Sequence, residues 1–373
     1  MTATPPAGRR TPSRRTLLTG SAALAATTAV GSCGDPAERS TASAPAPKAG
    51  ARPATRQRGI AEPQPRYALV AGLDLAPARR TPASVRPLRA ALAAWAALPL
   101  PPRATLTVAL GPALFPALGL PAPAVLRALP PFPRDRLDPR RGGGDVLVQL
   151  CAEGEGDAGP LADLLTATAS GLLVPRWRER GFLPPHAPGE TPRNLFGFKD
   201  GTENPPSDEA DRWVWHPDGS TVLVYRRIHM RIPDFAALPP GGQEEVIGRR
   251  LASGAPLTGR RERDPVDLYA KTPEGRYLIP SDAHVRLAHS RLDGGARMLR
   301  RGYSYDNGPG DRGLLFLAYM RDPALFGRVQ RRLDDGDALR VFTEHRASAL
   351  GLVLPAPGPG RPFGHPLLDS ARA

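Results

Sequence analysis

Apolar positions in the first half of the chain follow two different periods. Alternating or continuous apolar runs, typical of strands, cover residues 67–75, 105–110, 145–150 and 172–182. Between them, Ala/Leu-rich stretches with helical spacing predict helices over residues 84–98 and 161–168. The order strand–helix–strand, strand–helix–strand is that of a split βαβ or ferredoxin-like unit.

The same order begins again after a Pro-rich loop. The elements predicted there are a strand over 221–230, a helix over 242–251, a strand over 314–320, a helix over 323–333 and a final strand over 350–354. We therefore predict an α+β fold whose two halves, residues 66–190 and 191–356, have similar order and precede a tail at 357–373.

The composition of the first 65 residues indicates a targeting signal followed by a linker. Arg14 and Arg15 precede a short Ala/Thr-rich apolar run that ends in Val-Gly-Ser-Cys33. Paired Arg before such a run resembles a twin-arginine export signal, and its end resembles a lipobox with Cys33 as the lipidated residue. We expect residues 1–33 to direct export, giving a secreted protein or a lipoprotein held on a membrane surface. An ordinary signal cut elsewhere and a basic tail are the alternatives.

Residues 34–65 are rich in Ala, Pro, Ser, Thr and Arg and have few large apolar side chains. Such a composition buries too little apolar surface to offset the entropy lost on ordering the chain. We expect a flexible stalk, with the folded part beginning near Tyr67.

Composition excludes several classes of protein. The chain has 373 residues and a net charge of +14, and loss of the four Arg of the signal segment lowers this to +10. Two Cys are too few for a disulfide scaffold or a Cys-rich metal site. The chain has no uninterrupted run of about 20 apolar residues, which excludes a polytopic membrane protein. Because the Arg residues are scattered and the protein is expected to be exported, nucleic-acid binding is disfavoured.

Three polar segments stand out against this background. Residues 194–205 read Asn-Leu-Phe-Gly-Phe-Lys-Asp-Gly-Thr-Glu-Asn-Pro, and Asp-Gly alone is a common turn dipeptide. Residues 282–291 read Asp-Ala-His-Val-Arg-Leu-Ala-His-Ser-Arg, and a lone His is more often a structural polar residue than a ligand. Residues 298–305 read Met-Leu-Arg-Arg-Gly-Tyr-Ser-Tyr, which alone would indicate a solvated basic face.

Taken together, the three segments resemble the dye-decolourising (DyP-type) haem peroxidases. Residues 197–201 are similar to the family's GxxDG motif, and the segment around His284 is similar to its proximal-histidine segment. The stretch that includes Arg300 resembles its Leu-Arg-Arg-Gly-x-x-Tyr segment. The resemblance covers roughly residues 67–355 and extends to the exported branch that includes the deferrochelatase/peroxidases. It implies two ferredoxin-like units with antiparallel sheets, and one haem b per chain.

The resemblance also implies roles for individual residues. His284 would bind the haem iron, and Asp337 is the candidate acceptor for its other ring nitrogen. Asp200 would take a proton from hydrogen peroxide and return it to the leaving oxygen. Arg300, or Arg301 if the register differs, would stabilise the developing negative charge. A carboxylate base predicts an acidic pH optimum for dye oxidation.

Further residues are expected to contact the haem because they follow the base and the axial ligand directly. They are Gly201, Thr202, Glu203, His289, Ser290 and Arg291. Arg291 is suited to a propionate because its guanidinium binds carboxylates bidentately, and His289 stands where relatives usually have Asn.

The sequence leaves three functions open. One is a peroxidase that uses hydrogen peroxide to oxidise dyes, phenolics or polymeric reductants. Another is a deferrochelatase-like protein that releases iron from haem, and the third is a basic lipoprotein without catalysis. Assembly as a homo-oligomer is left open.

Bulky dyes would need surface aromatic residues as electron relays. The candidates, each equally readable as a packing residue, are Tyr303, Tyr305, Tyr319, Trp213 and Trp215. Cys151 follows an apolar strand and is interpreted as a buried small hydrophobic residue.

Overall fold

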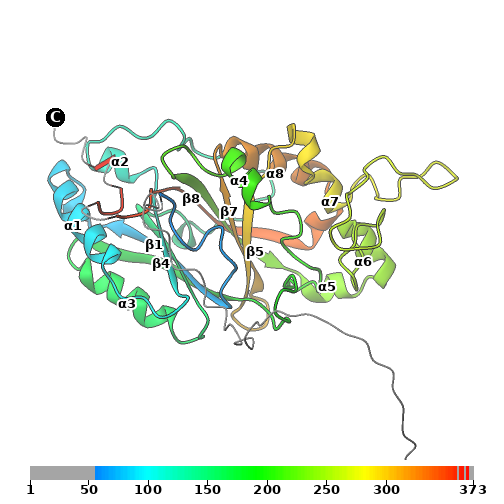
Figure 1. The fold of residues 1–373 in the computed structure, drawn as a ribbon, viewed down its shortest axis with the longest axis horizontal. Helices are drawn as coiled ribbons and strands as arrows, with labels where there is room; N and C mark the ends of the chain where they lie inside the picture. The colour runs from blue at the N-terminus through cyan, green and yellow to red at the C-terminus, as the bar shows by residue number, and fades with distance from the viewer. Residues whose placement is uncertain (1–54, 359–360, 365–366, 369–373) are drawn as a thin grey trace, which may run out of the picture. The chain divides into compact units, whose positions relative to one another are not determined.

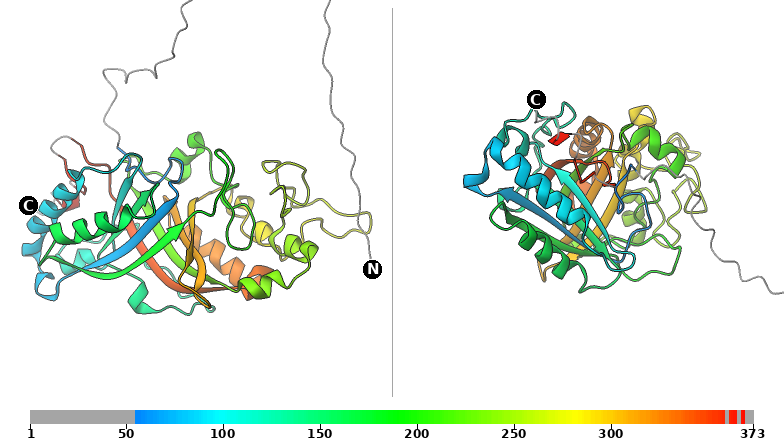
Figure 2. Two further views of the ribbon diagram at one scale, coloured as in Figure 1. Left: turned by 90° about the horizontal axis from the view of Figure 1, so that it is seen from below. Right: turned by 60° about the vertical axis from the view of Figure 1, so that its left-hand side comes forward.

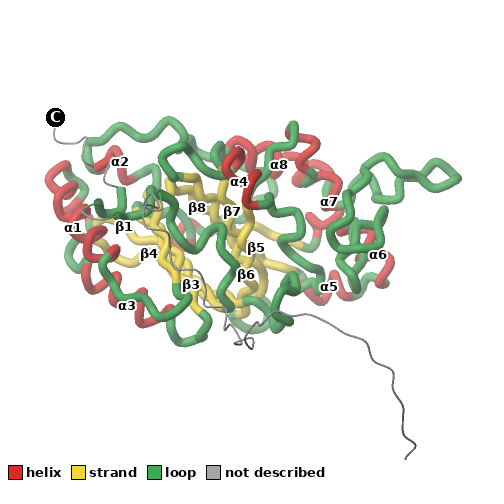
Figure 3. Tube along the Cα trace, viewed as in Figure 1, coloured by secondary structure: helices red, strands yellow, loops and turns green. Residues whose placement is uncertain are grey.

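Eight strands that close into a barrel form the centre of the fold (Figure 1, Figure 3). The structure is a computed structural model that describes residues 55–358, 361–364 and 367–368. The strands are β1 (Tyr67–Leu75), β2 (Thr105–Leu110), β3 (Val146–Ala152), β4 (Leu173–Phe182), β5 (Thr221–Met230), β6 (Leu299–Asp306), β7 (Arg312–Met320) and β8 (Thr343–Val353). The α-helices are α1 (Val85–Ala96), α2 (Leu114–Ala117), α3 (Ala158–Thr168), α4 (Ser207–Trp213), α5 (Ile232–Ala236), α6 (Pro240–Ile247), α7 (His284–Leu287) and α8 (Ala324–Gly336).

The strand order shows two copies of one topology. Around the barrel the strands run β1-β3-β2-β8-β5-β7-β6-β4, and neighbouring strands are antiparallel. Within each half, numbering its four strands in chain order gives the sequence 4-1-3-2, which is the ferredoxin-like arrangement. The predicted α+β fold with two antiparallel ferredoxin-like units is confirmed.

Helices α1 and α3 lie on the outside of the N-terminal strands (Figure 1, Figure 2). Leu88, Leu92 and Trp95 are spaced by four and three residues, so α1 presents all three on one face. They pack with strand residues such as Val108 in one buried cluster. The Trp95 indole N–H also donates to the carbonyl of Leu165 in α3, at 3.1 Å. This half of the molecule thus has a sheet-on-helix core of its own.

The interior of the barrel is filled with aromatic side chains. Trp177 of β4 stacks on Tyr225 of β5, with ring centroids 4.8 Å apart and planes 12° apart. Tyr303, Tyr305 and Tyr319 from β6 and β7 are fully buried in the same cluster. Because side chains alternate along a strand, the residues between them on β6 face the outside of the barrel. One strand therefore serves both the barrel core and the outer surface.

The folded part begins about ten residues before Tyr67, so the predicted stalk extends too far. Gln57 is buried, and its side-chain amide donates to the carbonyls of Val108 and Leu354, both at 2.8 Å. Its Oε1 accepts from the backbone N–H of Val108 at 2.7 Å. Ile60 is fully buried. β2 and β8 pair at only two residue positions, and next to them the Gln57 side chain makes the hydrogen bonds that a strand would otherwise make. The composition of residues 34–65 does not reveal this contact.

Residues 1–33 and most of 34–65, for which export, lipidation and a stalk are expected, lie outside the described residues. None of the helices within the described ranges has the length and apolar character needed to cross a membrane.

Strand β6 is the main element absent from the sequence-based prediction. Its segment 299–306 contains two Arg and a Gly, which interrupt the apolar alternation that marked the other strands. The final strand is also longer than predicted, because β8 begins at Thr343 rather than Leu350. The helix predicted over 242–251 is α6, which ends at Ile247 before a left-handed Gly248. The other predicted helices and strands are present, with small shifts at their ends.

Candidate active site

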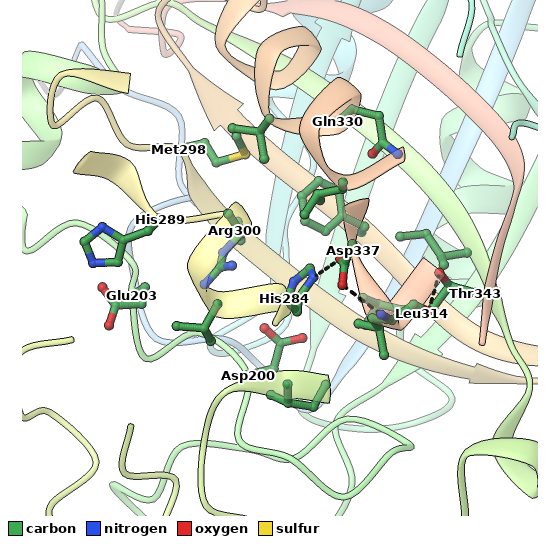
Figure 4. Close-up of a pocket in the computed structure, with 18 of the residues that line it drawn as sticks. Asp200, Glu203, His284, His289, Met298, Arg300, Leu314, Gln330, Asp337 and Thr343 are labelled. Atoms are coloured by element: carbon green, nitrogen blue, oxygen red, sulfur yellow. Dashed lines mark hydrogen bonds and ion pairs between the residues drawn. The ribbon is translucent and has the colours of Figure 1, made fainter. Parts of the chain in front are cut away.

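A cavity with about 1830 Å³ of empty space, its open mouth included, lies on the outer face of the C-terminal strands (Figure 4). Its walls come from β5, β6, β7, β8, α7, α8 and the loop 194–203. The apolar wall is formed by Ile228, Met230, Leu314, Phe316, Leu325, Phe326, Val329 and Leu333. Among the described lining residues, Arg134 alone comes from the N-terminal half.

The loop 194–204 is a tight structure that presents Asp200 to the cavity. The side chain of Asn194 accepts from the N–H of Phe196 at 3.0 Å, and Gly197 has a φ of 86°, which favours glycine. Phe196 and Phe198 pack on Phe235, with the closer pair of ring centroids 4.3 Å apart. These contacts hold the loop against α5 in the C-terminal half.

Lys199 fixes the same loop from its other side. Its ammonium donates to Glu262 at 2.8 Å, and Glu262 also accepts from the hydroxyl of Thr191. Burial raises the pKa of Glu262, but the bonds from Lys199 and Thr191 lower it by more, so its pKa lies below the ordinary value. The residue before Asp200 is thus tied to a second loop.

Asp200 and Arg300 meet at the cavity wall. The side chains of Asp200, Arg300 and His284 point towards one part of the cavity (Figure 4). Within the described part, neither the Asp200 carboxylate nor the Arg300 guanidinium has a hydrogen-bond or ion-pair partner. A Cβ added to Gly302 would lie 3.3 Å from Oδ2 of Asp200, so glycine there leaves room for the carboxylate. Both groups are therefore available to a ligand.

Asn204 positions the backbone of Arg300. Its Oδ1 accepts from the Arg300 N–H at 2.9 Å, and its Nδ2 donates to the Arg300 carbonyl at 2.8 Å. On this edge β6 pairs with β4 only at Ser304. The Asn204 side chain thus acts as a strand partner for Arg300 and joins the Asp200 loop to β6.

Arg301 lies on the other face of β6. Its buried guanidinium donates to the carbonyls of Ile60 and Glu62, at 2.9 and 2.5 Å. This decides the register that the sequence left open, because Arg300 and not Arg301 lines the cavity.

His284 begins α7 and is held by Asp337. Its Nδ1 lies 2.6 Å from Oδ2 of Asp337, whose Oδ1 accepts from the Leu339 N–H at 2.8 Å. Burial lowers the pKa of His284, but the charge and hydrogen bond of Asp337 raise it by more, so the net direction is upward. No described residue hydrogen-bonds Nε2, which leaves that nitrogen free to bind a ligand in the cavity.

Five of the six further predicted contact residues line the cavity: Gly201, Thr202, Glu203, His289 and Ser290. Burial lowers the pKa of His289. Arg291 does not line the cavity, so the propionate contact predicted for it lacks the expected geometry. The 3₁₀ turn at 290–293 carries its guanidinium outward, where it lies 5.1 Å from the ring centre of Tyr269.

Arg249, Asn204 and Gly302 are site residues that sequence reasoning did not single out. Arg249 is buried at the cavity wall and pairs with Glu203 at 2.5 Å. Burial lowers its pKa. Asn204 lies in the same segment as Asp200, and Gly302 lies in the same segment as Arg300. Their closeness in sequence to these two candidates is the signal that could have identified them as site residues.

Family models match most of the described chain. The model of the C-terminal domain of Dyp-type peroxidases matches residues 191–357, and that of the N-terminal domain matches residues 57–183. The chain belongs to the Dyp-type peroxidase family. Its enzyme class is that of the haem peroxidases, and proteins of this family depend on haem.

Curated relatives of this Dyp-type peroxidase carry two names. A dye-decolorizing peroxidase of Thermobifida fusca is 40% identical over 366 residues, covering 85% of this chain and 84% of that protein. A deferrochelatase of Yersinia pseudotuberculosis is 39% identical over 284 residues, covering 68% of this chain and 64% of that protein.

Solved structures share the fold. A DyP-type peroxidase from Streptomyces coelicolor has a TM-score of 0.79 and 33% identity, with 84% of this chain and 95% of that chain covered. An oxyferrous complex of DtpA from Streptomyces lividans has a TM-score of 0.78 and 34% identity, with 84% and 96% covered.

The relay candidates of this peroxidase are mostly enclosed. Tyr303, Tyr305 and Tyr319 are fully buried, and Trp215 is 1% exposed. Trp213 is partly exposed, with the Arg212 guanidinium 4.4 Å from its ring centre. The expectation for Cys151 is met: the thiol is buried and free, and burial raises its pKa. In the described part no cluster of three or more His, Cys, Asp or Glu could hold a metal ion.

Proposed function

We propose that this peroxidase uses hydrogen peroxide to oxidise dyes, phenolics or similar reductants at one haem b per chain. The observation that carries this proposal is the convergence of three groups on one cavity: the imidazole of His284 braced by Asp337, the Asp200 carboxylate and the Arg300 guanidinium. The apolar walls fit a porphyrin, and the free Nε2 of His284 would be able to bind its iron.

The residues that would hold the haem are His284 and the apolar side chains of the cavity. When bound, the haem supplies the iron at which peroxide is reduced. Asp337 orients the imidazole and increases its electron donation. Arg297, whose contact with Glu209 is a long ion pair of 3.7 Å, is available to a propionate in place of Arg291.

Asp200 and Arg300 would divide the work of cleaving the O–O bond. Asp200 would accept a proton from one oxygen of hydrogen peroxide and donate it to the other oxygen, which leaves as water. Arg300 stabilises the negative charge that develops between these events. Gly302 and Asn204 keep the two groups side by side, the first by its small size and the second through the Arg300 backbone.

The visible spectrum of the purified or reconstituted protein tests the proposal. We expect a Soret band that is lost in His284→Ala, and a band that persists in Asp200→Asn while peroxide turnover falls. Failure of the wild-type protein to bind haem after reconstitution would refute the proposal.

Haem iron release is the second candidate function. Its support is the similarity to curated deferrochelatases over 68% of this chain. The two functions separate in one assay: iron release yields free protoporphyrin from added haem, whereas a peroxidase consumes peroxide and donor and leaves no metal-free porphyrin.

We also propose export through the signal at residues 1–33, with Cys33 as a lipid anchor. The support is the Arg14-Arg15 pair and the lipobox-like end of the apolar run. Arg14→Lys together with Arg15→Lys should retain the protein in the cytoplasm, and Cys33→Ala should move it from membranes to the soluble exported fraction. Unchanged fractionation of either variant would contradict the corresponding part.

A further inference from the structure

The strand that carries Arg300 is paired unequally along its two edges. β7 pairs with β6 over its whole length, whereas β4 pairs with it, in the described part, at Ser304 alone. Residues two apart in an antiparallel strand turn their backbone N–H and C=O towards the same edge. The backbone groups of Arg300 and Gly302 therefore face the edge that β4 leaves open. Both residues need hydrogen-bond partners from elsewhere, and Asn204 serves Arg300.

The partner of Gly302 comes from the N-terminal arm, by which we mean residues 57–66. The Gln64 side-chain amide in this arm donates to the Gly302 carbonyl at 3.1 Å. At the end of the arm, the Arg66 carbonyl accepts from the N–H of Leu183, the residue after β4, at 2.8 Å. The N-terminal arm therefore connects β4 with β6 where the pairing of these two strands stops.

The N-terminal arm is also attached to β6 from inside the barrel. The guanidinium of Arg301 donates to the carbonyls of Ile60 and Glu62, and the Tyr303 hydroxyl donates to the Pro65 carbonyl at 3.2 Å. Arg301 is 2% exposed, and no carboxylate within the described ranges pairs with it. Burying a cation without a counter-ion costs stability. Stability alone therefore does not favour an arginine at this position.

The other end of the N-terminal arm is fixed to the N-terminal half. The hydroxyl of Thr107 in β2 donates to the Arg58 carbonyl at 2.9 Å, and the amide of Gln149 in β3 donates to the Gly59 carbonyl at 2.7 Å. Ile60, fully buried, belongs to the same apolar cluster as the barrel interior. Because β2 and β3 hold one end of the arm, the other end can resist movement of β6.

The attachments on β6 lie next to the two groups proposed to cleave peroxide. Arg300 and Gly302 are the neighbours of Arg301 on the outer face of the strand, and Gly302 is in near contact with the Asp200 carboxylate. The side chains of Arg300 and Asp200 point towards the same part of the cavity (Figure 4). A shift of β6 would therefore move the guanidinium relative to the carboxylate. A displacement of about 1 Å in a catalytic group can cost about 100-fold in rate.

We propose that Gln64 and Arg301 are positioning residues for peroxide cleavage, an inference that rests on the proposed peroxidase function. Through them the N-terminal arm holds β6 at its open edge and at its inner face, so that the Arg300 guanidinium keeps its place beside the Asp200 carboxylate. Neither positioning residue lines the cavity. The segment that begins the described fold thus supports the active site as well as the barrel.

Steady-state kinetics of the haem-loaded Gln64→Leu variant test the proposal. This change removes the donor to Gly302 with little change in size. We expect kcat/KM for peroxide to fall about tenfold, and kcat/KM for a small phenol at saturating peroxide to stay within about twofold of wild type. An unchanged value for peroxide, or an equal fall for both substrates, overturns the proposal. If the wild type consumes no peroxide, the proposed function itself fails, which is a distinguishable result.

Gln243→Leu is the matched control. Gln243 in α6 is half-buried like Gln64, and its side-chain amide also donates to a backbone carbonyl, that of Leu238, at 2.9 Å. It does not line the cavity. We expect both kinetic constants of this variant to stay within about twofold of wild type. A tenfold fall for peroxide in Gln243→Leu would show that loss of any such bond has the effect, and it would overturn the proposal.

A double-mutant cycle separates positioning from a general structural role. If Gln64 acts through Arg300, adding Gln64→Leu to Arg300→Leu should lower kcat/KM for peroxide by less than about twofold further. A second tenfold loss overturns the proposal.

Substitutions at Arg301 test the inner attachment. One nitrogen, Nη1, makes both of its bonds to the N-terminal arm, and a lysine ammonium has enough donors to replace it. Arg301→Lys should therefore keep kcat/KM for peroxide within about threefold of wild type, whereas Arg301→Met should lower it about tenfold. Equal values for the two variants overturn the role of Arg301.

Hydrogen exchange of the haem-free protein provides a readout without turnover. In Gln64→Leu, the amide of Arg300 should exchange about tenfold faster than in the wild type, because the open edge of β6 is less firmly held. The same amide should keep its wild-type rate in Gln243→Leu. An unchanged rate in Gln64→Leu would show that the N-terminal arm does not hold this edge, and it would overturn the proposal.

Discussion

Removal of the Asn204 side chain tests how Arg300 is positioned. In Asn204→Ala, the N–H and carbonyl of Arg300 lose their side-chain partners, at 2.9 and 2.8 Å. β7 continues to pair with this stretch of β6 on the opposite edge. The strand therefore stays in the barrel while its outer edge at Arg300 is released.

The expected loss follows from the two hydrogen bonds. Each contributes about 1 kcal/mol net, so the unfolding free energy should fall by about 2 kcal/mol. The effect on catalysis should be larger, because a displacement of about 1 Å in a catalytic group can cost about 100-fold in rate. We expect kcat/KM for peroxide to fall between about tenfold and 100-fold.

Denaturant unfolding of the haem-free protein and stopped-flow mixing of the loaded protein with peroxide measure the two effects. Asn307→Ala is the matched control, since Asn307 lies at the far end of β6, in an exposed turn, and bonds Asp311 at 3.0 Å. Its unfolding free energy should change by no more than about 0.5 kcal/mol. If Asn204→Ala loses stability but reacts with peroxide within threefold of the wild-type rate, the Asn204 side chain does not position Arg300 for catalysis. If its stability is unchanged, the hydrogen-bond reasoning is wrong.

Three further predictions address the acid/base residue, the axial ligand and a buried histidine. Asp200→Asn should lower kcat/KM for peroxide by about 10²-fold to 10⁴-fold with the Soret band retained; turnover within tenfold of wild type would remove Asp200 from the mechanism. Asp337→Asn keeps an acceptor for His284 but loses the charge, so haem affinity in apoprotein titrations should fall about tenfold or more; an equal affinity would contradict the bracing role. Burial and the charge of Arg226 hold the pKa of His345 well below its usual range, so the unfolded chain takes up this proton below about pH 6.5 while the folded chain does not. The unfolding free energy of the apoprotein should therefore fall, by up to about 1.4 kcal/mol per pH unit on this account, between pH 7 and pH 5.5, and less steeply in His345→Asn; equal slopes would refute the assignment.

The sequence was a good guide wherever local pattern decides structure. Apolar periodicity predicted seven of the eight strands and the four longest of the eight α-helices in the described part, since one face of each packs on a core. The candidates Asp200 and His284 were singled out because recognisable segments carry them, and Asp337 was chosen by its position in the C-terminal segment. The repeated order of elements indicated two ferredoxin-like halves.

What could not be predicted depends on distant contacts. Arg291 was expected at a propionate, but a 3₁₀ turn directs it to Tyr269, twenty-two residues earlier in the chain. The role of Asn204 requires knowing that β6 has an open edge at Arg300, ninety-six residues later. Side chains that satisfy a backbone edge far away leave no periodic signal, so composition and spacing do not locate them.

The hydrogen bonds of Gln57 also bear on how far the N-terminus can be truncated and on how the fold responds to mechanical force. Its three hydrogen bonds cross the short seam between β2 and β8, and a chain cut to begin at Tyr67 would uncover the carbonyls of Val108 and Leu354. Mechanical load applied through the N-terminus reaches the contacts of Thr55, Arg56 and Gln57 before it reaches any barrel strand, since the Thr55 carbonyl accepts from the Ala356 N–H at 2.8 Å and Arg56 pairs with Asp211 at 2.6 Å. Force spectroscopy with an N-terminal handle should therefore report the strength of this attachment first.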